Sequence, residues 1–256
     1  MSRVRTLIIR APGTNCDGET AFAFQQAGAE VSLVHVNRLI HCEERLADYQ
    51  IFVIPGGFTY GDDVAAGKVL ANELSLRLRD DILKFIEDGK LILGVCNGFQ
   101  VLVKAGFLPE SANGSSSQLT LANNDSGKFE CRWGYMAANK QSNCVFTKGV
   151  DSLYLPVAHG EGKLVADPAI LPRLNVALYY TDETGNTSVG YPYNPNGSMN
   201  NIAGICDSSG RVFGLMPHPE RHVRGTQHPQ WTRLGARPYG DGFPIFQNAV
   251  AWAKRL

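Results

Sequence analysis

The sequence lacks an excess of either charge and lacks any apolar run long enough to cross a membrane. Lysine plus arginine and aspartate plus glutamate each number 24, so the formal net charge is +0. This balance argues against electrostatic binding to nucleic acid or to an anionic membrane surface. The first apolar run, within "MSRVRTLIIRAPG", is too short for the core of a signal peptide. We therefore expect a cytoplasmic protein whose partners include neither nucleic acid nor membrane.

The six cysteines include no C-x-x-C pair and no zinc-like spacing with histidine. In a reducing cytosol such thiols stay mostly free, buried and inert. The adjacent acids Asp62 and Asp63 could suggest a metal, but neighbouring aspartates are more often a solvated turn or a helix cap. The chain also has no G-x-x-x-x-G-K-[ST] loop to hold a nucleotide. We expect neither a metal ion nor a cofactor in this chain.

The first half of the chain alternates between short apolar runs and helical segments. The predicted strands are residues 5–10, 30–36, 49–57 and 90–95. The segment "ANELSLRLRDDILKFIEDG" is predicted to form one helix ending at Gly89, because apolar residues recur four apart along it and just before it. Those apolar residues are Leu70, Leu74, Leu78, Ile82 and Ile86. Strands separated by helices indicate a mostly parallel central sheet with helices on both faces.

The second half reads differently, as shorter strands separated by polar loops. The predicted strands are residues 129–138, 143–147, 152–162 and 175–181, followed by a hairpin over 201–220 with a Ser-Ser-Gly turn. A helix closes the chain at residues 243–256. We expect an α/β fold with an added antiparallel β portion in the C-terminal half. No linker or repeat is evident, so residues 1–256 are predicted to form a single domain.

Cys96 lies where a predicted strand turns into a helix. The string Gly94-Val95-Cys96-Asn97-Gly98 has the form G-x-nucleophile-x-G, in which glycines permit a sharp turn and close packing. Such a turn exposes the sulfur at the positive end of a helix, which favours the reactive thiolate. The backbone N–H of Asn97 would face a developing oxyanion. Cys16 also stands between a strand and a helix but lacks the glycines, so it is the weaker candidate nucleophile.

A nucleophilic thiol needs a base and a group that orients the base. His218 and Glu220 stand two apart in "MPHPER", and the prolines at 217 and 219 favour an extended chain. Residues i and i+2 of an extended chain project to one side, so the carboxylate can fix the tautomer of the imidazole. An α/β-hydrolase has its acid before its histidine. Here the histidine comes first, which argues against that family.

These motifs together resemble those of a known family. "GVCNGFQ" followed by "PHPE" is similar to the triad-type (class I) glutamine amidotransferases. "PGTNCD", "PGGFTYGDD" and "PVAHGEG" narrow the resemblance to the glutaminase components of phosphoribosylformylglycinamidine synthases. The resemblance covers most of the chain and implies a flavodoxin-like three-layer sandwich. It also implies hydrolysis of glutamine to glutamate and ammonia, used to convert formylglycinamide ribonucleotide to formylglycinamidine ribonucleotide in purine biosynthesis.

The resemblance assigns roles to individual residues. Cys96 would form a thioester with the glutamine side chain, and His218, held by Glu220, would move the protons. The oxyanion would rest on the backbone N–H of Asn97 and of Gly57 or Phe58. The "AHGEG" segment would meet the glutamine α-amino and carboxylate groups through its backbone. The expected oxyanion and substrate residues are Gly57, Phe58, Asn97, Gln100, His159, Gly160 and Glu161.

The resemblance also implies partners. ATP and Mg²⁺ would bind to a separate synthetase chain, and a small bridging subunit would complete the complex. "YPYNPNGSMNN" and residues 222–244 resemble a longer, fused form of the synthase, so His222, Arg224, Trp231 and Arg233 are candidates for partner contacts or for a self-packed loop. Two alternatives stay open: a glutaminase subunit of another amidotransferase, and a stress protein or chaperone with a cysteine elbow. The latter typically has histidine where this chain has Asn97.

Overall fold

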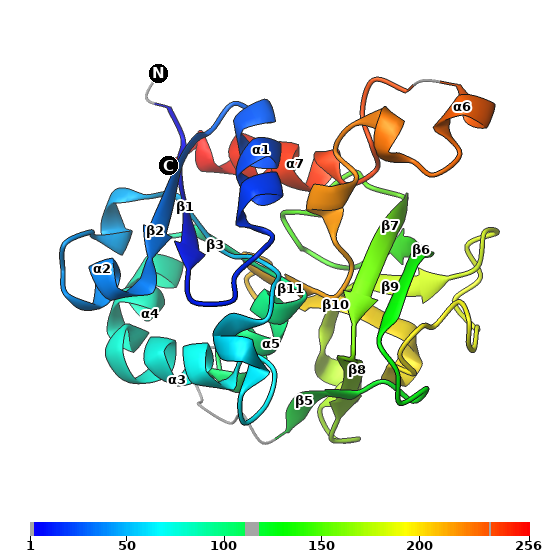
Figure 1. Ribbon diagram of the computed structural model, residues 1–256, viewed down its shortest axis with the longest axis horizontal. Coiled ribbons are helices and arrows are strands. Elements are labelled where there is room, and N and C mark those ends of the chain that lie inside the picture. The colour runs from blue at the N-terminus through cyan, green and yellow to red at the C-terminus, as the bar shows by residue number, and fades with distance from the viewer. Residues whose placement is uncertain (1–2, 111–117, 236) are drawn as a thin grey trace.

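The structure is a computed structural model that describes residues 3–110, 118–235 and 237–256 (Figure 1). A large sheet has the strand order β2-β1-β3-β4-β11-β10-β9-β6-β7, and β5 and β8 form a separate pair. The strands are β1 (Arg5–Arg10), β2 (Glu30–His35), β3 (Ile51–Ile54), β4 (Leu91–Val95), β5 (Leu119–Asn123), β6 (Glu130–Ala138), β7 (Ser152–His159), β8 (Glu161–Ala166), β9 (Asn175–Thr181), β10 (Ile202–Cys206) and β11 (Val212–Leu215).

The large sheet has a parallel half and an antiparallel half. The strands from β2 to β11 in the sheet order pair in parallel, whereas those from β11 to β7 pair antiparallel. Every residue of β3 and β4 is buried, as expected for parallel strands covered on both faces. The predicted α/β fold is confirmed, with one refinement. The antiparallel strands continue the same sheet and do not form a layer of their own.

Helices cover both faces of the parallel half (Figure 1). On one face α1 (Asp17–Gln26) packs against α7 (Phe243–Ala253), with the ring centroids of Phe24 and Phe246 5.0 Å apart. On the other face α5 (Asn97–Lys104) packs against β3, β4 and β11. The remaining helices are α2 (Val36–Ile40), α3 (Lys68–Arg77), α4 (Arg79–Glu87) and α6 (Trp231–Leu234). This is the predicted three-layer sandwich. In the described ranges, we find no helix with the length and apolar character needed to span a bilayer.

The single helix predicted to end at Gly89 is two helices in the structure. The apolar face is correct, since all five of its residues are buried. The chain nevertheless breaks at Leu78, where φ is −126° and ψ is 9°, between α3 and α4. One turn of an α-helix takes 3.6 residues, so residues spaced four apart shift by about 40° around the helix axis at each step. An apolar face built on this spacing therefore winds around a long helix. The break accompanies a change of packing partner, because α3 packs mainly against α5 and α4 packs against β4.

The strand predicted over residues 143–147 is wrong, because that segment forms turns. Its apolar side chains are buried as a strand's would be, yet side chains and a distant loop satisfy its backbone. Asn248 Nδ2 donates to the carbonyls of Phe146 and Lys148, and Val145 N–H donates to Gly210 O. The predicted hairpin is confirmed as β10 and β11, with Gly210 in the left-handed region at φ 73°.

Candidate active site

Cys96 sits on the sharp turn between β4 and α5 that its glycines predict, but it is buried rather than exposed as predicted, and it reaches solvent through the cavities that it lines. Its φ of 49° and ψ of −103° are strained for a residue with a side chain, as at other functional turns. A Cβ on Gly98 would lie 1.8 Å from the carbonyl oxygen of Ile54. A Cβ on Gly94 would lie 2.7 Å from the carbonyl oxygen of Gly98. No side chain fits at either position. The glycines of the motif therefore bring α5 directly against β3 and β4.

His218 reaches the same edge of the sheet because β4 and β11 are parallel neighbours. Val95 stands opposite Leu215 in the register, so the residues that follow both strands leave the sheet together. The backbone confirms this closeness, since Cys96 N–H donates to Leu215 O at 2.8 Å. Cys96 and His218 line one cavity of about 210 Å³. The carboxyl ends of two adjacent strands thus bring a thiol and an imidazole 122 residues apart in the sequence to one place.

Glu220 orients His218 as the sequence predicts. The distance from His218 Nδ1 to Glu220 Oε1 is 2.6 Å, and both side chains are buried. A carboxylate only accepts hydrogen bonds, so Nδ1 carries a proton, and Nε2 is the nitrogen left to exchange a proton with the thiol. Burial alone would lower the pKa of His218, but the negative charges of Glu220 and Cys96 outweigh burial and raise the pKa well above its usual value. The segment differs in one detail, because Pro219–Arg221 forms a 3-10 turn and not an extended chain.

Cys16 proves to be a near neighbour of the base. Its sulfur lies 4.0 Å from His218 Nδ1 and accepts a hydrogen bond from Arg221 Nη2 at 3.1 Å. Burial raises the pKa of the Cys16 thiol. This sulfur faces the imidazole nitrogen whose proton is already shared with Glu220, whereas Nε2 has no partner among the described residues. The orientation of the imidazole therefore disfavours Cys16 as the nucleophile. In the sequence, the only reason to rank Cys16 below Cys96 is that it lacks the flanking glycines.

A second cavity of about 350 Å³ also opens at Cys96. The predicted substrate residues that line it are Gly57, Phe58, Gln100, His159, Gly160 and Glu161. Gln100 Nε2 donates to Glu161 O and Gln100 Oε1 accepts from Asn97 Nδ2, so the amide of Gln100 is fixed between α5 and the start of β8. The structure therefore brings the residues of three separate sequence motifs to one pocket beside the thiol.

The two candidates for the second oxyanion donor differ in the structure. Phe58 N–H donates to Gly13 O at 2.9 Å, so it is already engaged. The N–H of Gly57 has no acceptor in the described part of the chain. A Cβ on Gly57 would approach Gly13 O to 2.7 Å, which explains the glycine there. Asn97 opens the first turn of α5, where backbone N–H groups have no helical partner. Gly57 and Asn97 are therefore the donors that fit, and Phe58 contributes its ring at the mouth of the cavity.

Asp62 takes a larger part in the site than the sequence indicated. It accepts a hydrogen bond from Asn97 Nδ2 at 3.2 Å and lines the larger cavity. Burial, the largest influence, raises its pKa. The described residues also contain one group of potential metal ligands, because donor atoms of Cys16, His218 and Glu220 lie within 4.8 Å of one another. Arg221 places a cation against that sulfur, which disfavours a metal ion there.

Residues 222–244 only partly fit the predicted partner surface. His222 is buried, its Nδ1 lies 2.8 Å from Tyr154 O, and its ring meets Trp133 edge to face at 5.1 Å. A partner contact by His222 is therefore wrong, and the self-packed alternative holds for it. Arg224 lies over the ring of Phe22 at 4.4 Å. By contrast with His222, Trp231 is 41% exposed and both Arg224 and Arg233 are exposed, so all three are accessible to a partner.

Comparison with protein families gives a match over nearly the whole chain. The model of the CobB/CobQ-like glutamine amidotransferase domain matches residues 3–253. The chain belongs to this amidotransferase family. The resemblance inferred from "GVCNGFQ" and "PHPE" is confirmed, and the family match favours the amidotransferase over a stress protein with a cysteine elbow.

Individual relatives of this amidotransferase carry more specific names. It is 56% identical over 256 residues to the phosphoribosylformylglycinamidine synthase subunit PurQ of Dehalococcoides mccartyi, with 100% of both chains covered. It is 43% identical over 265 residues to the protein of the same name from Methanococcus maripaludis, with 97% of each chain covered. It is also similar to a chain in the solved structure of PurLQS from Thermotoga maritima. That match has a TM-score of 0.76 and 33% identity, and covers 98% of this chain and 99% of that one.

Proposed function

We propose that this amidotransferase is the glutaminase component of a phosphoribosylformylglycinamidine synthase. One observation carries the proposal. His218, with its proton held on the side of Glu220 and Nε2 unpartnered, shares a cavity with the elbow thiol Cys96. Such an arrangement suits attack on a carboxamide, because thiol, base and orienting acid are all in place. The relatives that align over their full length are named as subunits of this synthase, which supports the choice of pathway.

The geometry supports hydrolysis in two stages. The Cys96 sulfur attacks the carboxamide carbon of glutamine, and the electron pair of the C=O bond moves to an oxygen held by the N–H groups of Asn97 and Gly57. His218 has taken the Cys96 proton on Nε2 and now delivers it to the nitrogen, the C–N bond breaks, and ammonia departs to leave a γ-glutamyl thioester. His218 then takes a proton from water, and the hydroxide attacks the thioester carbon. The C–S bond breaks, which releases glutamate and restores the thiolate.

The backbone around residues 159–161 would bind the amino-acid end of glutamine. His159, Gly160 and Glu161 line the larger cavity, and Gln100 is hydrogen-bonded to Glu161 O beside them. Backbone groups suit this task because they recognise the shape and charge of the α-amino and carboxylate groups at fixed positions. In this arrangement the amino-acid end lies in the larger cavity and the carboxamide lies at Cys96, where the two cavities meet.

The ammonia must reach an acceptor without escaping into water, where it would be protonated and lose its nucleophilicity. We therefore expect a synthetase subunit, and a small bridging subunit, to bind this chain as one complex. The synthetase would bind ATP and Mg²⁺, because this sequence has no phosphate-binding G-x-x-x-x-G-K-[ST] loop. In this proposal the chain acts in the cytoplasm as one domain and needs no cofactor of its own. A glutaminase subunit of another amidotransferase is the alternative, and the amino acceptor distinguishes the two.

Mass spectrometry after treatment with a glutamine-shaped electrophile, such as a chloroketone analogue, tests the chemistry. We expect Cys96 to carry the label and Cys16 to remain unmodified. Cys96→Ala should abolish glutamine-dependent synthase activity in the presence of the synthetase, while ammonia-dependent activity persists. If glutamine-dependent activity survives in Cys96→Ala, the proposal is wrong. Formation of formylglycinamidine ribonucleotide from its formylglycinamide precursor tests the pathway directly.

A further inference from the structure

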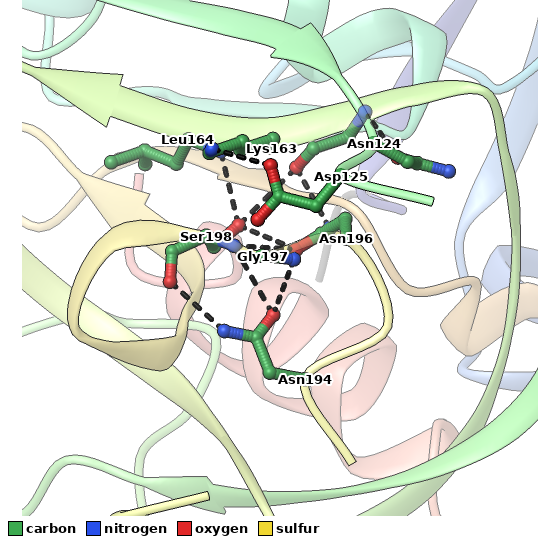
Figure 2. A network of polar contacts seen from close by, with 9 residues as sticks. Asn124, Asp125, Lys163, Leu164, Asn194, Asn196, Gly197 and Ser198 are labelled. Atoms are coloured by element: carbon green, nitrogen blue, oxygen red, sulfur yellow. Dashed lines mark hydrogen bonds and ion pairs between the residues drawn. The ribbon is translucent and has the colours of Figure 1, made fainter. Parts of the chain in front are cut away.

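The turn that lines the glutamine cavity is held from behind by a loop that the mechanism does not use. This turn, residues 159–162, joins β7 to β8. The loop, residues 194–198, lies between β9 and β10. Figure 2 shows its side chains pointing together beneath the start of β8. Asn194, Asn196 and Ser198 are all buried. Buried amides and hydroxyls require hydrogen-bond partners, so the partners of this cluster indicate its role.

Asn196 connects the loop to the turn directly. Its Nδ2 donates to Gly162 O at 2.8 Å, and its Oδ1 accepts from the backbone and hydroxyl of Ser198 at 3.0 and 2.7 Å. Ser198 Oγ in turn accepts from Leu164 N–H at 3.0 Å. The side chain of Asn196 is 0% exposed, so each of these bonds is protected from water. One amide therefore fixes the loop through its oxygen and the start of β8 through its nitrogen.

A second asparagine holds the other end of the turn. Asn124 Nδ2 donates to His159 O at 2.7 Å, and Asn124 Oδ1 accepts from Gly162 N–H at 3.1 Å. The same oxygen lies 3.2 Å from His159 Nδ1, and because it can only accept, the imidazole proton lies on Nδ1. The backbone N–H of Asp125 donates to Asn196 O at 3.2 Å, which joins the two supports. Both ends of the turn are thus fixed by one connected network.

The close fit at Gly162 shows how tightly the network holds the turn. A Cβ at this position would lie 2.6 Å from His159 Nδ1 and 2.9 Å from Asn196 Nδ2. The cavity residues Gly160 and Glu161 lie between the two points at which the network holds the backbone. A displacement of this backbone would move the carbonyl of Glu161, to which Gln100 is bonded.

We infer that Asn196 is a positioning residue for glutamine, acting through the backbone of residues 159–162. This inference rests on the proposed function, since it assigns that backbone to the amino-acid end of the substrate. Loss of the Asn196 donor should weaken recognition of a glutamine-shaped ligand and leave the intrinsic reactivity of Cys96 in place. The nucleophile has no hydrogen bond to the loop among the described residues, and its sulfur donates to Ala158 O at 3.6 Å, just before the turn that the network holds.

Two alkylating reagents separate recognition from reactivity. One is the chloroketone analogue of glutamine, and the other is iodoacetamide, which is too small to need the turn. We expect Asn196→Ala to react with the analogue about tenfold more slowly, as for one lost buried hydrogen bond, and with iodoacetamide within about twofold of wild type. Asn196→Asp should behave like Asn196→Ala, because it keeps an oxygen for Ser198 and loses the donor to Gly162.

Asn139→Ala is the matched control for a purely structural effect. Asn139 Nδ2 donates to Val176 O at 2.8 Å, so it also ties a loop to a strand, and it lines neither cavity at Cys96. This variant should lower the melting temperature without changing the ratio of the two alkylation rates. If both Asn196 variants slow the two reagents equally, the inference is wrong and Asn196 is only structural. If wild type itself is not labelled at Cys96 by the analogue, the proposed function fails and the inference fails with it.

Discussion

The two halves of the large sheet contribute to the site by different physical means. In the parallel half, Cys96 and His218 follow adjacent strands, and close backbone packing at Gly94 and Gly98 fixes the turn. In the antiparallel half, the substrate turn is fixed by the side chains of Asn124 and Asn196. The conformation of the Cys96 turn is set by steric contacts of two glycines with neighbouring backbone, so it depends on few residues. A position set by buried amides depends on contacts between distant segments. The Cys96 turn thus depends on backbone contacts, and the proposed substrate-binding turn depends on side chains from other segments.

The largest effect should come from the pair that orients the base. Glu220→Gln keeps the shape but removes the charge that fixes the His218 tautomer, so glutamine-dependent activity should fall by about 100-fold or more. Ammonia-dependent activity of the reconstituted synthase is the control and should not change. An equal loss with both nitrogen sources would instead indicate that Glu220 acts on folding or assembly.

Two glycine substitutions compare the halves directly. Gly98→Ala would place a Cβ against backbone at 1.8 Å and should lower the free energy of unfolding by about 3 kcal/mol or more. Gly162→Ala would meet side chains, which can move, and should cost about 1–2 kcal/mol. Gly18→Ala is the control, because nothing lies within 4 Å of its Cβ in the first turn of α1. Denaturant unfolding measures all three, and equal costs at Gly98 and Gly162 would contradict the comparison.

His159 and His218, both buried, should give opposite pH dependences. Burial, and then the charge of His218, lower the pKa of His159 to about 4, so the folded chain keeps it neutral. An unfolded chain protonates it below about 6.5, so its contribution of roughly 3 kcal/mol is present above that pH and lost as pH falls towards 4. The pKa of His218 is raised, so its contribution is present below about 6.5 and lost as pH rises through the folded pKa.

Unfolding at a series of pH values checks these signs. His159→Asn should flatten the acid side of the stability curve, because no imidazole remains to be protonated in the unfolded state. Glu220→Gln should flatten the alkaline side, since the charge that raises the pKa of His218 is gone. If His159→Asn instead altered the alkaline side of the stability curve and Glu220→Gln altered the acid side, the directions of the two pKa shifts would be wrong.

The smallest effect on the fold is expected at the exposed segment. Trp231→Ala removes a ring that is 41% exposed on α6, so the free energy of unfolding should change by less than about 0.5 kcal/mol. Binding to the synthetase should weaken about tenfold if this ring lies in the interface. His222→Ala is the contrasting variant. Loss of this buried imidazole should lower the free energy of unfolding of the chain itself. Calorimetry of complex formation distinguishes the two, and unchanged binding by Trp231→Ala would remove α6 from the proposed interface.

The sequence predicted those parts of the site that are set locally. Five residues around Cys96 indicated the elbow, and two prolines indicated that His218 and Glu220 lie side by side. Arg221 follows directly in "MPHPER" and could have been noticed there, but its bond to Cys16 spans 205 positions. The role of Asn196 had no local signal, since its bond to Gly162 spans 34 positions. The hydrogen bond that engages Phe58 N–H likewise depends on how a distant loop folds back.

The same reasoning accounts for the errors in the fold. The break at Leu78 lies where the packing partner changes from α5 for α3 to β4 for α4, which spacing along one segment does not reveal. The strand predicted at residues 143–147 is absent, and the carboxamide of Asn248, about 100 positions away, satisfies the carbonyls of Phe146 and of the adjacent Lys148. In both cases the burial of side chains was predicted correctly, and the backbone conformation was decided by a remote partner.

The six cysteines, all reduced, bear on how any labelling of this chain is interpreted. Cys42 and Cys131 are exposed, and Cys131 also lines the smaller cavity beside Cys96. A simple count of reactive thiols would therefore combine Cys42 and Cys131 with the proposed nucleophile, and a bound substrate would shield Cys131 as well as Cys96. Stoichiometry alone has no diagnostic value here. Only peptide-level assignment of the modified position reports on turnover.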